Sequence, residues 1–248
     1  MTPTFSIITV TWNAAKVIPP TLKSVKAQSC TDYEYLVVDG ASTDQTLQLV
    51  NEAGIAGTRI VSERDNGLYD AMNKAIRLAK GKYLIWMNAG DAFADADSLA
   101  RLADAAKSNP GVIYGQTQVV NAERQVVGMR HLTAPAQLSA DNFKHGMLVC
   151  HQAFVARRTL CPRYDTRYHY SADFDWCLRI LSKSRKVVNS HATLVRFLDG
   201  GVTKSHIAQG LHERFDIMRQ HFGTASTVAH HIPIALKFLW FWVTRGRF

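Results

Sequence analysis

The sequence predicts an α/β protein built around a mainly parallel, three-layer sheet. Three observations support this fold class: strand-type and helix-type patterns alternate over the first hundred residues, the strands are rich in β-branched residues, and Asp, Asn or Gly follows successive strands. Strands that alternate with helices pair in parallel, because each crossover returns the chain to the same end of the sheet. With 248 residues, 47% of them hydrophobic and 20% charged, the chain can bury such a core.

Four strands and three helices are expected in the first half of the chain. The strands are expected at residues 5–11, 33–38, 59–62 and 83–87. The first helix should begin near Pro19, which suits the first turn of a helix. The second should begin after three residues that favour N-caps, namely Ser42, Thr43 and Asp44. The third carries an apolar stripe over residues 68–79, with Gly81 as its expected C-cap.

The pattern changes after residues 109–111. Residues 112–120 and 125–130 are typical of a hairpin, the region to about residue 170 is irregular, and a helix is expected over 171–184. We therefore expect an α/β half at residues 1–108, an elaboration of the same domain at 109–215, and a separate helical segment at 216–248. No internal repeat or low-complexity tract interrupts this order.

The C-terminal residues 231–248, HIPIALKFLWFWVTRGRF, are dense in apolar and aromatic residues. About 20 apolar residues are needed to cross a bilayer, and this segment is shorter and interrupted by Lys237. Two interpretations stay open: an amphipathic helix lying on a membrane surface, and a helix docked on the core or on another subunit.

The formal charge of +9 calls for an anionic partner or surface. Motifs for nucleic-acid binding are missing, so membrane and lipid-diphosphate acceptors are favoured over nucleic acid, with solvated surface charge as the alternative. The four cysteines are widely spaced and predict reduced thiols rather than disulfides or a zinc site. The N-terminal residues lack the features of a signal peptide, which favours a cytoplasmic protein.

Polar residues recur where three strands of the predicted sheet end. They are Asp39, residues 63–67 and residues 88–91, and in open α/β sheets ligands bind beyond the carboxyl ends of the strands. Neither a P-loop nor a GxGxxG motif follows the first strand, which argues against the common phosphate-binding loops. A carboxylate at a strand end can instead hold Mg²⁺ or Mn²⁺ that bridges to a diphosphate, and Asp91 is the expected metal ligand.

Five segments occur in the order found in a known enzyme family: SIITVTWNA, VVDGASTDQT, ERDNGLYDAMNKAI, GKYLIWMNAGD and SADFDWCLR. Over roughly residues 5–180 the chain thereby resembles family-two glycosyltransferases with the GT-A (Rossmann-like) fold. Among these it is similar to bacterial enzymes that assemble exopolysaccharide, capsule, colanic-acid or O-antigen units. The resemblance implies a nucleotide-diphosphate-sugar donor, a divalent metal, and inversion at the anomeric carbon.

The resemblance also implies roles for individual residues around the donor. Those matching the loop beneath the base are Thr9, Thr11 and Asn13. Those matching the base-reading turn are Asp39 and Ser42. Those matching the segment along ribose and diphosphate are Asp65, Asn66, Gly67 and Asn73. The family's Asp-x-Asp motif is replaced by Asn88, Ala89, Gly90 and Asp91, so that Asp91 alone keeps a carboxylate and a metal-free mechanism stays open.

The resemblance places the catalytic base at Asp173 in SADFDW, where Ala172 stands in the place of a family Glu. The alternative for an acidic residue in a first helical turn is interaction with the helix dipole. This alternative suits Asp175, which can also pair with Arg179. We expect Asp91 and Asp173 to face one sugar from opposite sides.

Other residues could complete the site. The segment His151-Gln152 resembles the family's acceptor side, and Lys204 or His206 could close over the diphosphate from a Gly-rich loop. The expected acceptor is a glycan or a polyprenyl-diphosphate-linked glycan at the cytoplasmic face of the inner membrane. Two other functions stay open: an inactive nucleotide-sugar-binding or scaffold protein, and a sugar-phosphate nucleotidyltransferase, which should carry an N-terminal Gly-rich loop that this chain lacks.

Overall fold

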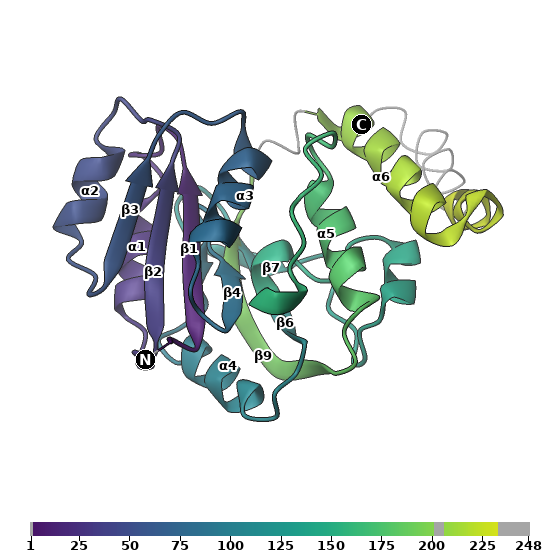
Figure 1. Ribbon diagram of the computed structural model, residues 1–248, viewed down its shortest axis with the longest axis horizontal. Coiled ribbons are helices and arrows are strands. Elements are labelled where there is room, and N and C mark those ends of the chain that lie inside the picture. Colours follow the sequence, from purple (N-terminus) through teal and green to yellow (C-terminus); the bar gives the residue numbers. More distant parts are fainter. Residues whose placement is uncertain (1, 201–205, 233–248) are drawn as a thin grey trace.

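The computed structural model of the chain describes residues 2–200 and 206–232 (Figure 1). The expected flap residue Lys204 and residues 233–248 of the C-terminal segment lie outside the described residues. No helix in the described ranges is both long and apolar enough to cross a lipid bilayer.

One mixed sheet runs through both halves of the described chain. Its strand order is β3-β2-β1-β4-β8-β6-β9-β5, and β7 pairs with β6. The strands are β1 (Phe5–Thr11), β2 (Tyr33–Asp39), β3 (Thr58–Ser62), β4 (Tyr83–Trp86), β5 (Ala92–Phe93), β6 (Val112–Val120), β7 (Val126–Met129), β8 (Phe154–Arg157) and β9 (Val187–Leu198). The α/β fold class predicted from the sequence is confirmed.

The parallel arrangement belongs to the first four strands. β1 pairs in parallel with β2 and β4, and β2 pairs in parallel with β3. Beyond β4 the sheet is mixed, since β8 is antiparallel to both β4 and β6, whereas β9 is parallel to β6. The hairpin expected after residue 111 is confirmed as β6 and β7. Because β4 pairs with β8, the two halves share one sheet.

Six α-helices surround the sheet in the described residues, and a further helical stretch covers 224–232. They are α1 (Pro19–Lys26), α2 (Thr46–Glu52), α3 (Leu68–Leu78), α4 (Ser98–Ala106), α5 (Ala172–Leu181) and α6 (Ile207–Phe222). The 3₁₀ helices are η1 (Ala140–His145), η2 (His151–Ala153) and η3 (Arg158–Leu160). α6 lies beyond α5, on the side away from β1–β4 (Figure 1).

Three expectations about helix ends need correction. α3 ends with Ala79 as its C-cap, and Gly81 instead packs where an added Cβ would overlap the backbone of Phe5 and Ser6. The N-cap of α2 is Gln45, although Asp44 Oδ1 still accepts the Thr46 amide at 3.0 Å. α5 is three residues shorter at its C-terminus than expected.

Burial follows the position of each strand in the sheet. All seven residues of β1 are buried, since this strand lies between β2 and β4. Behind the carboxyl ends of the strands, Trp86 packs edge-on against Tyr164 and Trp176, and the last two rings stack with centroids 5.1 Å apart. This aromatic cluster packs β4 against the second half of the chain.

Candidate active site

The carboxyl ends of β1, β2 and β3 lie side by side. Thr11 is the register partner of Asp39, which in turn is the partner of Ser62. The Asp39 carboxylate is fully buried and accepts three hydrogen bonds: Ser42 Oγ at 2.5 Å, the Ser42 amide at 2.9 Å and Ser62 Oγ at 2.7 Å. Asp39 therefore organises the turn that follows β2, and it is Ser42 rather than Asp39 that reaches the surface.

The loop after β1 is tied to the same turn. Asn13, which has a positive φ of 46°, accepts the Thr43 amide at 2.9 Å through Oδ1 and donates its own amide to Ser42 Oγ at 2.8 Å. Thr9 lies inside the sheet, where its hydroxyl donates to the Met87 carbonyl at 2.7 Å. Of these residues, Asn13 and Ser42 are brought together, whereas Thr9 faces the interior.

Trp12 is an exposed residue beside the candidate site that the sequence analysis did not single out. Its side chain is 69% exposed, although it directly follows the buried strand β1. A Cβ built on Gly40 would lie 3.4 Å from Trp12 Cδ1 and 2.7 Å from Asp65 Oδ2, so the indole and this carboxylate both approach Gly40. An aromatic residue in T-W-N, between a buried strand and a polar turn, was the signal that could have identified it.

The loop after β3 forms the start of α3. Asp65 Oδ1 accepts the Gly67 amide at 2.9 Å, and the Asn66 amide donates to Asp70 Oδ2 at 3.0 Å. Gly67 has a φ of 106° and occupies the N-cap position, which explains the need for glycine there. Asp65, Asn66 and Gly67 thus lie at a helix N-terminus, where two amides already donate to the carboxylates of Asp65 and Asp70.

Asn73 lies apart from that surface. Its side chain donates to the Tyr164 carbonyl at 3.0 Å and accepts the Tyr164 amide at 2.7 Å. Both polar atoms of this buried amide are therefore used to join α3 to the second half of the chain. The structure gives Asn73 a structural contact in place of the expected position beside the ribose and diphosphate.

The Asn88–Asp91 loop after β4 is held from three directions. Gly90, with a φ of 105°, donates its amide to Thr21 Oγ1 at 2.9 Å, and its carbonyl accepts from the Arg124 guanidinium. Asp91 is 4% exposed; its Oδ1 accepts the Leu198 amide at 3.0 Å and its Oδ2 accepts Gln152 Nε2 at 2.6 Å. Burial raises the pKa of Asp91 to about 7, a shift that these hydrogen bonds partly offset.

One oxygen atom of this loop suits a hard divalent cation without giving up a partner. Asn88 Oδ1 is buried and has no hydrogen-bond partner within the described residues, whereas both carboxylate oxygens of Asp91 already accept hydrogen bonds. The same ranges contain no group of three His, Cys, Asp or Glu side chains placed to hold a metal ion. An ion here would therefore take most of its ligands from a bound diphosphate and from water.

Asp173 lies in the first turn of α5 and contacts the first half of the chain. Its Oδ1 accepts Tyr69 Oη from α3 at 3.3 Å and the Phe174 amide at 2.9 Å. Burial, followed by the negative charge of Asp173, raises the pKa of Tyr69 well above its usual value, so this phenol stays protonated and donates. Tyr69 in turn stacks on Tyr164, whose hydroxyl lies 2.8 Å from His151 Nε2.

Residues 150–152 connect the two carboxylates. Gln152 binds Asp91, and its Oε1 accepts Cys150 Sγ at 2.9 Å. Burial raises the pKa of Cys150 to about 11, and the charges of Asp91 and Asp173 both contribute to this shift. Both carboxylates therefore lie within electrostatic reach of one thiol. Burial lowers the pKa of His151 to about 4, so its imidazole is neutral near pH 7.

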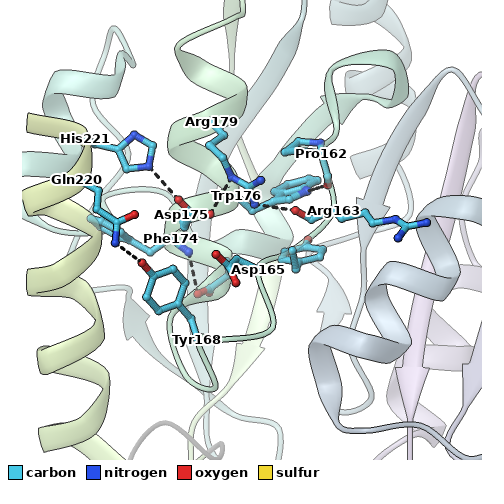
Figure 2. Close-up of polar contacts among 12 residues, drawn as sticks. Pro162, Arg163, Asp165, Tyr168, Phe174, Asp175, Trp176, Arg179, Gln220 and His221 are labelled. Carbon is cyan, nitrogen blue, oxygen red and sulfur yellow. Dashed lines mark hydrogen bonds and ion pairs between the residues drawn. The ribbon is translucent and has the colours of Figure 1, made fainter.

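The neighbouring carboxylate Asp175 has a different environment. Its Oδ2 lies 2.7 Å from Arg179 Nε, as the four-residue spacing predicted, and its Oδ1 lies 2.8 Å from His221 Nε2 of α6 (Figure 2). Asp175 is thus neutralised between two helices, whereas Asp173 points toward Tyr69. Of the expected flap residues, the described His206 stacks on Tyr170 with ring centroids 4.6 Å apart.

The chain is similar to known glycosyltransferases in sequence. The model of the family described as "Glycosyl transferase family 2" matches residues 6–161, more than half of the chain. A curated relative, the PGL/p-HBAD biosynthesis glycosyltransferase of Mycobacterium bovis, is 37% identical over 189 residues, which cover 73% of this chain and 70% of the relative. Chondroitin synthase of Escherichia coli is 29% identical over 125 residues, 50% of this chain and 18% of that protein.

Solved structures show the same fold. S. aureus TarS 1-349 in complex with UDP-GlcNAc matches with a TM-score of 0.71 at 17% identity, covering 92% of this chain and 72% of that one. The mannosyltransferase PcManGT from Pyrobaculum calidifontis, in complex with GDP-Man and Mn²⁺, matches with a TM-score of 0.62 at 17% identity over 95% and 76%. At these identities the likeness establishes the GT-A fold alone.

Proposed function

The chain belongs to glycosyltransferase family 2, and from this premise we propose that it transfers a sugar from a nucleoside-diphosphate donor to a glycan or lipid-linked hydroxyl, with inversion at the anomeric carbon. The observation that carries the proposal is the hydrogen bond between Tyr69 and Asp173. This bond sets the carboxylate of α5 against α3, whose N-terminus lies at the strand ends of the first half. Asp173 is therefore the acid–base group best placed between a donor and an acceptor.

The nucleotide is proposed to bind over the loops after β1, β2 and β3. Trp12 offers an exposed aromatic face for a nucleobase, and Ser42 offers a hydroxyl held in place by Asp39. The dipole of α3 favours phosphate at its N-terminus, although the Asn66 and Gly67 amides there already donate to Asp70 and Asp65. TarS and PcManGT, which share the fold, carry UDP-GlcNAc and GDP-Man in their solved structures, which supports a nucleotide sugar without choosing the base.

A divalent metal is proposed to assist at the Asn88–Asp91 loop, with Asn88 Oδ1 as one ligand and Asp91 as a second ligand that would exchange one of its two hydrogen bonds for the ion. When bound, such an ion would neutralise charge that builds up on the leaving diphosphate. The protein's own contribution is to hold this loop rigid through Thr21 and Arg124. Support comes from the unpartnered Asn88 Oδ1 and from the Mn²⁺ in PcManGT.

Asp173 is the proposed general base. Inversion needs a group that removes the proton of the acceptor hydroxyl as this oxygen attacks the anomeric carbon from the face opposite the leaving diphosphate. Tyr69 holds one oxygen of Asp173, which leaves the other for the acceptor. Asp175 is unsuited to this role, because Arg179 and His221 already occupy both of its oxygens.

The acceptor is proposed to be anchored at a membrane surface on the cytoplasmic side. Four exposed apolar side chains lie on α6 and on the helical stretch after it: Ile207, Leu211, Val228 and Ile232. Their i, i+4 spacing within each helix gives two apolar stripes, and the chain's net charge of +9 would attract anionic lipid. This arrangement suits an enzyme whose acceptor is lipid-linked.

Donor turnover tests the proposal. The purified chain is incubated with UDP-, GDP- and dTDP-sugars in Mn²⁺ or in EDTA, and nucleoside diphosphate release is measured. We expect slow hydrolysis of one donor class, suppressed by EDTA. Pyrophosphate formation from a nucleoside triphosphate and a sugar phosphate would instead identify a nucleotidyltransferase, and donor binding without turnover would identify a scaffold protein.

The base is tested with Asp173→Asn. We expect turnover to fall by about 100-fold or more, in the range that general bases contribute, while donor affinity measured by calorimetry stays within about twofold. Asp104→Asn, on the exposed surface of α4, is the matched control and should behave as wild type. A loss of donor affinity equal to the loss of turnover would reject Asp173 as the base.

A further inference from the structure

The turn before α5 is held by one carboxylate of α6. The His169 amide donates to Glu213 Oε1 at 2.8 Å, and the amides of Tyr170 and Ser171 donate to Oε2 at 2.9 and 2.8 Å. Three consecutive backbone amides that donate to one carboxylate form an anion-binding concavity, known as a nest. Hydrogen bonds to a charged acceptor are also stronger than those between neutral groups. Glu213 thus fixes the backbone two residues before Asp173.

The N-cap residue of α5 is also bound to α6. A serine at this position usually caps an amide of its own helix. Ser171 makes no such bond, and its hydroxyl donates instead to the Gly210 carbonyl at 3.1 Å. The Ser171 carbonyl closes the first turn by accepting the Phe174 amide at 3.1 Å, and Asp173 Oδ1 accepts the same amide at 2.9 Å. The orientation of Asp173 therefore depends on how firmly α6 holds Ser171.

Two residues near the C-terminus of α6 also contact the turn and the first helical turn of α5. Gln220 Nε2 donates to Tyr168 Oη at 2.8 Å, and His221 meets Asp175 (Figure 2). We call Gly210, Glu213, Gln220 and His221 the α6 clamp. All four contact residues 168–175, so one face of α6 grips the whole turn that leads into α5.

The clamp and the proposed base act on the same phenol. Burial raises the pKa of Tyr69 most strongly, and the charges of Asp173 and Glu213 raise it further. Glu213 therefore lies within electrostatic reach of the hydroxyl that binds Asp173.

We propose that Glu213 is a positioning residue for sugar transfer: it fixes the 168–171 turn so that the Asp173 carboxylate stays beside Tyr69 and meets the acceptor hydroxyl. The inference rests on the proposed role of Asp173 as general base. A base must lie within hydrogen-bond reach of its proton, and a displacement of about 1 Å can cost about 100-fold in rate. A contact made only to backbone amides can therefore influence the reaction strongly.

Glu213→Gln tests the role, because glutamine keeps the size of the side chain but loses its charge and turns an NH₂ group toward one amide. We expect kcat to fall about tenfold, with the donor dissociation constant unchanged within about twofold. The control is Asp216→Asn on the same helix, because the Asp216 carboxylate pairs with Arg219 and His212 within α6. This control should keep wild-type kcat.

A double-mutant cycle separates positioning from general stabilisation. If Glu213 acts through Asp173, adding Glu213→Gln to Asp173→Asn should lower the residual turnover by less than about twofold, because the group being positioned is already lost. A further tenfold loss in the double variant would show independent effects and overturn the proposal.

Amide hydrogen exchange measures the clamp without any activity. The amides of residues 169–171 should exchange faster in Glu213→Gln than in Asp216→Asn or wild type. Unchanged exchange in Glu213→Gln would refute the role of Glu213. Faster exchange with wild-type kcat in Glu213→Gln, while Asp173→Asn is inactive, would also refute the role of Glu213 and leave the proposed base standing. Normal turnover of Asp173→Asn would instead refute the proposed base.

Discussion

The side chains around the candidate site fall into two groups. Those of Asp39, Thr9 and Asn73 are buried and bonded within the protein, whereas that of Trp12 is exposed and that of Asp173 is partly exposed. A buried polar group must find a partner inside the protein, and short polar residues at a loop meet this need as readily as they meet a ligand. Residue type and spacing alone therefore do not separate organising residues from contacting ones.

Trp12→Ala should weaken donor binding. Stacking of a base on an aromatic ring contributes about 1–3 kcal/mol, so we expect the donor KM to rise by about 5- to 150-fold while kcat changes less than about threefold. Trp12→Phe keeps an aromatic face and should recover most of the affinity. Steady-state kinetics with the preferred donor gives both constants, and an unchanged KM in Trp12→Ala would place the base elsewhere.

At the scale of elements, most boundaries follow from local sequence, and the exceptions come from close packing. Gly81 has the sequence context of a helix C-cap, yet α3 ends at Leu78 and the glycine lies against the start of β1. Ser171 has the sequence of an N-cap, yet its hydroxyl binds α6. In both cases a contact with a distant segment replaced the local role that propensity favours.

Gly81→Ala should destabilise the fold. The new Cβ would overlap the backbone of Phe5 and Ser6, which the buried strand β1 holds in place, so we expect a loss of about 2–4 kcal/mol in the free energy of unfolding. Gly210→Ala is the matched control: its Cβ would lie 3.7 Å from Tyr170 Cβ, an ordinary contact, and helical alanine gains about 0.5–1 kcal/mol. Urea unfolding of both variants checks the difference, and equal stabilities would contradict it.

At the scale of the whole molecule, the site depends on joining two halves of the chain. The sheet continues from β4 into β8, and the Asn73 side chain binds the Tyr164 backbone 91 residues away. The Tyr69–Asp173 contact spans 104 residues. Gln152 likewise binds Asp91 from 61 residues away, so tertiary packing sets the surroundings of both carboxylates of the proposed reaction.

Asn73→Ala should weaken this junction. It would leave the buried amide and carbonyl of Tyr164 without partners, and each unsatisfied group costs about 1–3 kcal/mol, so we expect a loss of about 2–6 kcal/mol. Asn51→Ala removes an exposed bond within α2 and should stay within about 0.5 kcal/mol of wild type. Thermal unfolding and donor KM are measured together. A large rise in KM at unchanged stability would instead support a direct donor contact for Asn73.

The sequence by itself determined the α/β class, the first four strands, the β6–β7 hairpin, the family, and the Asp175–Arg179 pair. These features follow from periodicity, from residue order and from helical spacing, all of which are local properties of the chain. Periodicity and residue order did not lead us to predict β9, α4 or the start of α6.

Only the tertiary structure decided which polar residues are buried and bonded and which side chains are exposed around the candidate site. Asp39 is buried and accepts a hydrogen bond from Ser42, and Asn73 binds the backbone of Tyr164. Trp12 is exposed, and Glu213 accepts backbone amides of the turn before Asp173. Each of these outcomes depends on a neighbour from another element, and on which buried donors and acceptors that neighbour must satisfy. Sequence spacing cannot specify such partners, because they meet only when the sheet and helices have packed.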